Sequence, residues 1–397
     1  MGGALEGFKV LDLSRVLAGP WAGQLLADLG ADVIKIERPG EGDETRAWSP
    51  PSLPDGTAAY FLCANRGKRS VTVDITRPEG QDIIRRLAAE ADVVLENYKV
   101  GGLAKYGLDY AALSAVNPAL VYCSITGFGQ DGPYASMPGY DFIIQGMSGL
   151  MSITGPADGE PHKVGVATTD LFTGLYAANA ILAALLARVR TGRGQHIDMA
   201  LFDCAVATLA NVSMNWLIGG KVPPRLGNAH PNIVPYQVFA TEGGGHFILA
   251  CGNDRQFVAV CEVAGHSEWS ADERFSTNPA RVRHRAELVP LLAGVFLTRS
   301  RDDWLARLDA AGVPCGPINT IDEAFADPQL VHRAMAISMI DSRGQKVPLS
   351  GCPIKLSDTP VGYTLAPPAL GEHTDEVLAA LGYDEARVAE LRRQGAI

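Results

Sequence analysis

The feature that most constrains the fold is an alternation, over the first two hundred residues, of short β-branched runs with helical patterns. This alternation is typical of a parallel sheet whose strands are joined by helices. The expected strands are 10–13, 33–37, 70–74, 93–96, 120–126 and 196–201, and the expected helices include 21–29, 80–89 and 171–189. The sequence therefore predicts an α/β fold with a doubly wound, Rossmann-like large domain.

After Gly219 the pattern changes, because a run of glycine and proline interrupts the alternation. Two short apolar runs then flank three consecutive glycines, as hairpin strands do, and two amphipathic helices follow. This part of the chain predicts a small α+β domain. The expected organisation is a large domain beginning with 1–205, a linker 206–225, a small domain 226–325 and a C-terminal segment 326–397 that returns to the large domain.

Composition excludes several classes of protein. A formal net charge of −10 over 397 residues disfavours nucleic acid or an anionic membrane as a partner. We find no apolar run of bilayer length and no leader-like N-terminus, so the expected location is the cytoplasm. Seven cysteines without a C-x-x-C pair argue against a disulfide framework.

Familiar catalytic motifs are missing from the sequence. It contains neither a G-x-x-x-x-G-K-[ST] loop nor a G-x-G-x-x-G turn after a strand, and it has no G-x-S-x-G nucleophile elbow. Its eight histidines are not spaced as paired metal ligands. We therefore expect no metal, and chemistry that rests on carboxylates, hydroxyls and backbone groups.

Asp170 stands where a polar segment passes into a long, alanine-rich helical pattern. An aspartate in this position is ordinarily an N-cap. A helix N-terminus also stabilises a carboxylate, which keeps it ionised and available as a nucleophile. Capping and nucleophilic catalysis are compatible roles for this residue.

Polar and basic residues follow several of the expected strands. The turn 14–20 follows the first strand, Arg38 the second, and Asn97, Tyr98 and Lys99 a later one. Ligands of open α/β sheets bind beyond the carboxyl ends of the strands, so these residues point to one crevice. A ligand that carries phosphate groups suits their chemistry.

The sequence resembles the class III CoA-transferases (CaiB/BaiF type) over almost its whole length. The segments that carry the resemblance are 10–20, 29–37, 65–70, 96–98, 124–129 and 191–195. The resemblance implies that Asp170 is the catalytic nucleophile, and that coenzyme A (CoA) enters as part of an acyl-CoA substrate with no further cofactor. It assigns the CoA contacts to Val16, Leu17, Ala18, Arg38, Val73, Asp74, Ile75, Thr76, Asn97, Tyr98, Lys105 and Tyr140.

Within this family the likeness is greatest to the succinyl-CoA:glutarate type. It rests on the segments 123–127, 148–151, 153–156, 233–237, 312–314 and 316–319. Leu17 and Lys105 stand where the oxalate-specific enzymes have glutamine and arginine, which argues against oxalate. The resemblance therefore implies succinyl-CoA as donor and a short dicarboxylate as acceptor, with glutarate, itaconate and a hydroxymethylglutarate-like acid all left open.

Two alternatives remain at this point. The family also contains α-methylacyl-CoA racemases, which pair the aspartate with a histidine, but residues 127–146 contain no histidine. Racemisation needs two acid/base partners, so this alternative is the weaker enzyme. The other alternative is a CoA-binding protein without catalysis.

The resemblance also suggests how substrates are enclosed and how chains assemble. Gly252 and Asn253 lie in a turn after a hairpin strand and are expected to form a lid. Arg225 and His230 are the expected cations for the distal carboxylate of a dicarboxylate. Family members form interlocked homodimers, and we expect the same assembly.

Overall fold

The computed structural model describes residues 2–397, which fall into two compact units. The first comprises the chain up to Gly149, Val164–Leu209 and Pro328–Ile397, and the second comprises Leu150–Lys163 and Ala210–Asp327. Each unit has its own hydrophobic core. The segment 206–225, expected as a linker, contains helix α9 (Ala210–Gly219).

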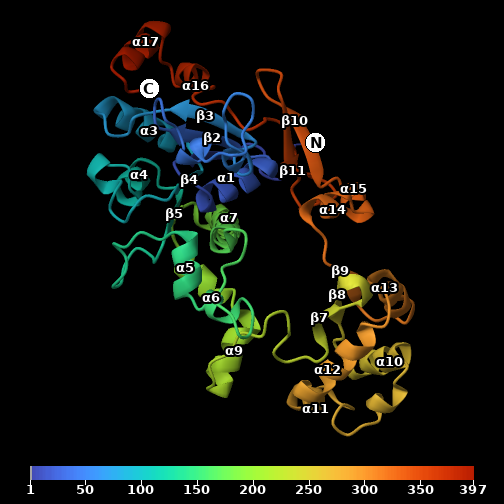
Figure 1. Cartoon of the computed structure of the whole chain (residues 1–397). Helices are drawn as coiled ribbons and strands as arrows, with labels where there is room; N and C mark the ends of the chain where they lie inside the picture. The colour runs from blue at the N-terminus through green and yellow to red at the C-terminus, as the bar shows by residue number, and fades with distance from the viewer. Residues whose placement is uncertain (1) are drawn as a thin grey trace. The chain divides into compact units, whose positions relative to one another are not determined.

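A six-stranded parallel sheet forms the centre of the first unit (Figure 1). Its strands are β1 (Lys9–Asp12), β2 (Asp32–Glu37), β3 (Lys68–Thr72), β4 (Val93–Glu96), β5 (Val121–Thr126) and β6 (His196–Ala200). The spatial order β3-β2-β1-β4-β5-β6 reverses direction between β1 and β4. This is the doubly wound arrangement, so the predicted α/β class is confirmed, and the crevice at such a reversal is the usual ligand site.

Helices cover both faces of this sheet. The helices of this unit are α1 (Ala18–Asp28), α2 (Ala59–Leu62), α3 (Pro78–Glu90), α4 (Tyr110–Val116), α5 (Asp141–Met147), α7 (Thr168–Thr191), α8 (Leu201–Ala207), α15 (Pro328–His332), α16 (Thr374–Ala380) and α17 (Glu385–Arg393). Val10 and Val93 pack with α1 and α7, whereas their neighbours Leu11 and Val94 pack with α3 and α17. Successive strand residues point to opposite faces of the sheet. Because helices bury both faces, these strands are continuous apolar runs in the sequence.

Helix α7 lies unusually close to α1. A Cβ atom on Gly174 of α7 would stand 2.6 Å from the carbonyl oxygen of Ala18, the first residue of α1, so only glycine permits this approach. By length and composition α7 could cross a membrane, which corrects the expectation that no such run exists. Ala177, Ile181 and Leu185 of α7 are nevertheless buried in the core of the sheet domain, whereas Leu186 and Val189 are exposed.

The C-terminal segment contributes to the first unit. It forms a hairpin of β10 (Ala336–Ile340) and β11 (Lys346–Ser350), followed by α16 and α17. The Thr72 amide donates to Thr374 Oγ1 over 3.0 Å, and the Asp74 amide donates to the Ala396 carbonyl over 2.8 Å. These contacts attach the end of the chain to the β3 side of the sheet.

The second unit is a small α+β domain, as the sequence predicts. An antiparallel sheet of β7 (Tyr236–Ala240), β8 (His246–Ala250) and β9 (Cys315–Pro317) packs against helices. The helices of this unit are α6 (Leu150–Ile153), α9, α10 (Asp254–Ala264), α11 (Asn278–Arg283), α12 (Arg285–Phe296), α13 (Arg301–Ala310) and α14 (Ile321–Ala326). Phe239, Phe247, Phe296 and Trp304 form an aromatic cluster at its centre, in which the Phe296 ring meets the other three edge-on.

Candidate active site

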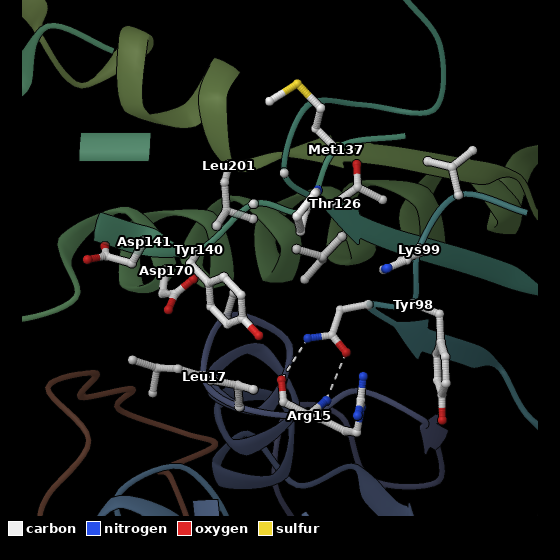
Figure 2. Close-up of a pocket in the computed structure, with 18 of the residues that line it drawn as sticks. Arg15, Leu17, Tyr98, Lys99, Thr126, Met137, Tyr140, Asp141, Asp170 and Leu201 are labelled. Atoms are coloured by element: carbon white, nitrogen blue, oxygen red, sulfur yellow. Dashed lines mark hydrogen bonds between the residues drawn. The ribbon is translucent and has the colours of Figure 1, made fainter. Parts of the chain in front are cut away.

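A cleft of about 180 Å³ opens at the carboxyl ends of β1, β4 and β5. Its walls are the turn 15–18 after β1, the turn 97–100 after β4, the end of β5 with residues 135–141, and Asp170 of α7. Figure 2 shows Asp170, Asp141 and Tyr140 beside one another, with Leu17 facing them across the cleft. The sheet therefore brings together side chains that are far apart in the sequence.

Half of the expected CoA contacts line this cleft together with Asp170: Val16, Leu17, Ala18, Asn97, Tyr98 and Tyr140. The other half lie outside it: Arg38, Val73, Asp74, Ile75, Thr76 and Lys105. Arg38 pairs with Glu41 over 2.9 Å, and the Lys105 ammonium stands 4.6 Å from the centre of the Tyr106 ring. Asp74 accepts hydrogen bonds from the amide and hydroxyl of Thr76.

The two turns after β1 and β4 hold each other in place. Asn97 Oδ1 accepts a hydrogen bond from the Arg15 amide over 2.9 Å, and Asn97 Nδ2 donates to the Arg15 carbonyl over 2.7 Å (Figure 2). The Arg15 guanidinium also stands over the Tyr98 ring at 5.2 Å. Because a single side chain satisfies both backbone groups of Arg15, the cleft wall is fixed before any ligand binds.

Asp170 is the third residue of α7 and not its N-cap, so the capping interpretation is wrong. The N-cap position is Ala167, which has no capping side chain. Asp141 supplies the missing acceptor from another helix, because its Oδ1 accepts from the Thr169 amide over 2.8 Å and from the Thr169 hydroxyl over 2.6 Å. With the end of α7 satisfied by Asp141, the Asp170 carboxylate is left to face the cleft.

The pKa of Asp170 is raised to about 7, first by burial and second by the negative charge of Asp141. Both causes disfavour the charged form of the carboxyl group. A carboxylate that is poorly solvated and close to its pKa at neutral pH is typical of a catalytic group.

A second perturbed carboxyl group lies behind the cleft. Burial raises the pKa of Glu96 to about 7, although Ser124 and the Tyr98 amide favour its charged form. The Tyr98 amide donates to Glu96 Oε2 over 2.7 Å, which braces the turn that presents Asn97 and Tyr98. Ser124 in turn is 2.9 Å from His196 Nε2.

The expected residues of the second unit make the following contacts. Arg225 donates to the carbonyls of Ser152, Pro156 and Gly159, and within residues 2–397 it has no ion pair with a carboxylate. Burial, and then Arg285, lower the pKa of His230, so its imidazole is neutral at pH 7. Asn253 is the N-cap of α10.

Gly252 belongs to the same capping turn. Its amide donates to Gln256 Oε1 over 2.7 Å, while the Gln256 amide donates to Asn253 Oδ1 over 2.9 Å. This reciprocal pair closes the turn at the start of α10.

Sequence reasoning placed the turn that contains Arg15, and Lys99, at the crevice, and both line the cleft. It did not single out Asp141, which also lines the cleft. The signal for Arg15 and Lys99 was their place in the turns that follow β1 and β4. Asp141 carried a weaker signal, as an acidic residue in the first turn of α5.

Comparison with known proteins gives the family. The sequence matches CoA-transferase family III over residues 5–374. The chain belongs to this family. It is 53% identical to a succinate–glutarate CoA-transferase of Agrobacterium fabrum over 95% of each chain. It is 44% identical to a succinyl-CoA:glutarate CoA-transferase of Mus musculus over 99% of this chain and 90% of the other.

A solved structure shares the fold of this family III enzyme. A CaiB/BaiF family protein from Brucella suis superposes with a TM-score of 0.84, at 55% identity, covering 96% of this chain and all of that one (100%). The chain is therefore a CoA-transferase, whose substrates are CoA thioesters, and the reading as a CoA-binding protein without catalysis is excluded. Among residues 2–397, no group of three or more His, Cys, Asp or Glu side chains is placed to hold a metal ion.

Replacing Asp141 by asparagine should lower the pKa of Asp170 from about 7, because it removes the neighbouring negative charge but keeps an oxygen for the Thr169 amide. If ionised Asp170 is needed for transfer, kcat/KM of the wild type rises with pH through about 7, and this limb moves to lower pH in Asp141→Asn. The measurement is the pH profile of kcat/KM. Glu44→Gln is the control, because Glu44 also lines the cleft, and it should leave the pH at which kcat/KM rises unchanged. If that pH is also unchanged in Asp141→Asn, the prediction is wrong.

Proposed function

We propose that this enzyme transfers CoA from succinyl-CoA to a short dicarboxylate, with glutarate as the first candidate, by covalent catalysis at Asp170. The observation that carries the proposal is a carboxylate of raised pKa in the cleft of a family III chain. The proposed donor and acceptor are those in the names of the similar enzymes of Agrobacterium fabrum and Mus musculus, a succinate–glutarate and a succinyl-CoA:glutarate CoA-transferase.

In the first half of the proposed reaction, an oxygen of Asp170 attacks the thioester carbonyl of succinyl-CoA. The carbon–sulfur bond breaks, CoA leaves as the thiolate, and a mixed succinyl–aspartyl anhydride remains. The thiolate then attacks the aspartyl carbonyl, which releases succinate and leaves CoA attached to Asp170 as a thioester.

The second half runs in reverse with the acceptor. The acceptor carboxylate attacks the aspartyl thioester and expels the thiolate, which gives a new anhydride. The thiolate attacks the acyl carbonyl of the acceptor, forming the product acyl-CoA and restoring the Asp170 carboxylate. Atoms and charges balance without an oxidant, a reductant or a further cofactor.

The CoA chain is proposed to run along the strand ends. The thioester lies against Leu17, Ala18 and Asp170, because all three line the cleft. Arg38 follows β2 and residues 73–76 follow β3, and in a parallel sheet both ends lie on the same edge as the end of β1. Together with Lys105, they are proposed to hold the nucleotide end, since Arg38 and Lys105 can pair with phosphates.

Arg225 is the proposed partner of the distal carboxylate of the acceptor. Its guanidinium is held by three carbonyls that carry no net charge, so its positive charge is not neutralised. His230 is a poorer choice, because its lowered pKa leaves the ring neutral. The capped turn at Gly252 and Asn253 is the proposed lid.

The proposed function is tested by incubating the purified protein with succinyl-CoA and a panel of carboxylic acids, with the CoA products identified by mass spectrometry. We expect glutaryl-CoA or another short dicarboxylyl-CoA, at a kcat/KM above that for oxalate or carnitine. Faster transfer to oxalate or carnitine contradicts the substrate assignment. Epimerisation of a 2-methylacyl-CoA without CoA transfer contradicts the reaction type.

Asp170→Asn should fold as the wild type does but lose essentially all transfer activity. The side chain is not the cap of α7, so an amide in its place should not lower stability, whereas a neutral amide cannot form the anhydride or the thioester. Trapping the wild type with hydroxylamine during turnover should modify the peptide that contains Asp170. Asp203→Asn is the matched control, because Asp203 is likewise the third residue of its helix, α8, but lies outside the cleft. Trapping at another carboxylate refutes the role of Asp170.

We further propose that the enzyme is a cytoplasmic homodimer. Helix α9 exposes a row of large apolar side chains, Met214, Trp216, Leu217 and Ile218, which a second copy of the chain would cover. Light scattering at micromolar concentration should give twice the 42.1 kDa chain mass. Ile218→Glu should weaken the dimer, whereas Val116→Glu, at an exposed site on α4, should not. A wild-type monomer overturns the assembly.

A further inference from the structure

We propose that the buried ion pair of Lys35 and Asp43 positions the turn 14–16 against the CoA cleft, and that both residues are positioning residues for the transferase reaction. The inference rests on the proposed function, because this turn forms the wall that we assign to the acyl-CoA. Neither residue lines the cleft itself.

The turn needs to be held because its backbone is strained. Val16 has a φ of +70°, and a β-branched residue adopts the left-handed region only against a steric penalty. Among residues 2–397, the other positive-φ residues besides glycine are Ala210 and Ala334, neither of which is β-branched or lines the cleft. Strain of this kind persists only where surrounding groups enforce the conformation.

Lys35 and Asp43 hold the backbone of this turn through hydrogen bonds to Ser14 and Val16. The Val16 amide donates to both carboxylate oxygens of Asp43, at 3.4 and 3.3 Å. Lys35 Nζ donates to the Ser14 carbonyl over 2.9 Å and to Asp43 Oδ2 over 2.9 Å. One ion pair therefore holds the backbone on both sides of Arg15.

Both side chains are completely buried, so each charge depends on the other. Burial raises the pKa of Asp43, but the charge of Lys35 together with hydrogen bonds from Lys35 and Thr45 holds it below its ordinary value. Burial also opposes the charge of Lys35, and the carboxylates of Asp43, Asp12 and Glu37 together raise its pKa. The pair is thus charged and intact throughout the neutral pH range.

The position of the turn explains why this matters for the reaction. Val16 is followed directly by Leu17, the N-cap of α1, and by Ala18, its first helical residue, and both line the cleft with Asp170. If Val16 relaxed to negative φ, the Leu17 backbone would rotate away from the cleft wall. A glycine at position 16 would take the conformation unaided, whereas valine makes it depend on Asp43.

This dependence gives a test by double-mutant cycle. Asp43→Asn removes the carboxylate that pairs directly with Lys35 and accepts from the Val16 amide, and it should weaken CoA binding and raise KM for succinyl-CoA, each by about tenfold or more. In a Val16→Gly background the same Asp43→Asn change should cost about threefold or less, because glycine no longer needs to be held. A purely structural role would produce equal losses in both backgrounds.

Calorimetry gives the Kd of CoA, and steady-state kinetics give KM and kcat. All three are measured below the unfolding transition of each variant, where the variant is folded. Asp341→Asn is the matched control, because Asp341 also accepts two backbone amides and pairs with an arginine, but in the β10–β11 turn. It should change stability without changing the Kd of CoA. Equal losses in both backgrounds, or an unchanged Kd in Asp43→Asn, overturn the proposal.

If Asp43→Asn does not fold, the pair is replaced as a whole by Lys35→Met with Asp43→Leu, which leaves no unpaired charge. The same loss of CoA affinity is expected, and an unchanged affinity refutes the inference. A wild type that binds no CoA overturns the proposed function as well. If the wild type binds and transfers CoA, and folded Asp43→Asn binds CoA with normal affinity, only the positioning role is overturned.

Discussion

The candidate site depends on the close approach of α1 and α7 at Gly174. Since Gly174 has no side chain, the Ala18 carbonyl can stand against α7, and the first turn of α1 meets the second turn of α7. A methyl group at this point would separate the helices and carry Asp170 away from Leu17 and Ala18. The backbone of one glycine thus sets the width of the cleft in which a thioester would have to fit.

Asp141 has two effects on the start of α7, one on its hydrogen bonding and one on the pKa of Asp170. Its carboxylate satisfies the Thr169 amide at the start of α7, and its charge raises the pKa of Asp170 nearby. The raised pKa has a cost: Asp170 in the folded chain binds a proton more readily than in the unfolded chain. Stability therefore falls as pH rises from about 4 to about 7, which is the pH range where the site gains its charged form.

The sheet could be predicted from the sequence, because β-branched runs that alternate with helical patterns are typical of parallel sheets. The edge at which residues such as Asn97 gather could also be predicted, because ligands bind beyond the carboxyl ends of parallel strands. It was not sufficient for contacts that depend on tertiary packing. Asp141 lies 28 residues before Thr169, and nothing local in the sequence shows that α5 delivers it to α7. The N-cap interpretation of Asp170 failed for the same reason. The left-handed backbone of Val16 was also hidden, since valine gives no signal for positive φ.

The carboxyl groups that line the cleft are partly or fully exposed, whereas two charged pairs lie buried behind it. Lys35 and Lys68 are both completely buried and pair with Asp43 and Asp12, so their charges are used within the protein. Burial lowers the pKa of Lys68 to about 8, although Asp12 favours its charged form. A free lysine beside Asp170 would stabilise the ionised carboxylate and make it a weaker nucleophile. Lys35 and Lys68 donate to backbone carbonyls around the cleft, while Arg15 and Lys99 line the cleft itself. Among the described residues, burial and the charge of Asp141 set the pKa of Asp170, so its carboxyl group keeps a raised pKa although two cations line the same cleft.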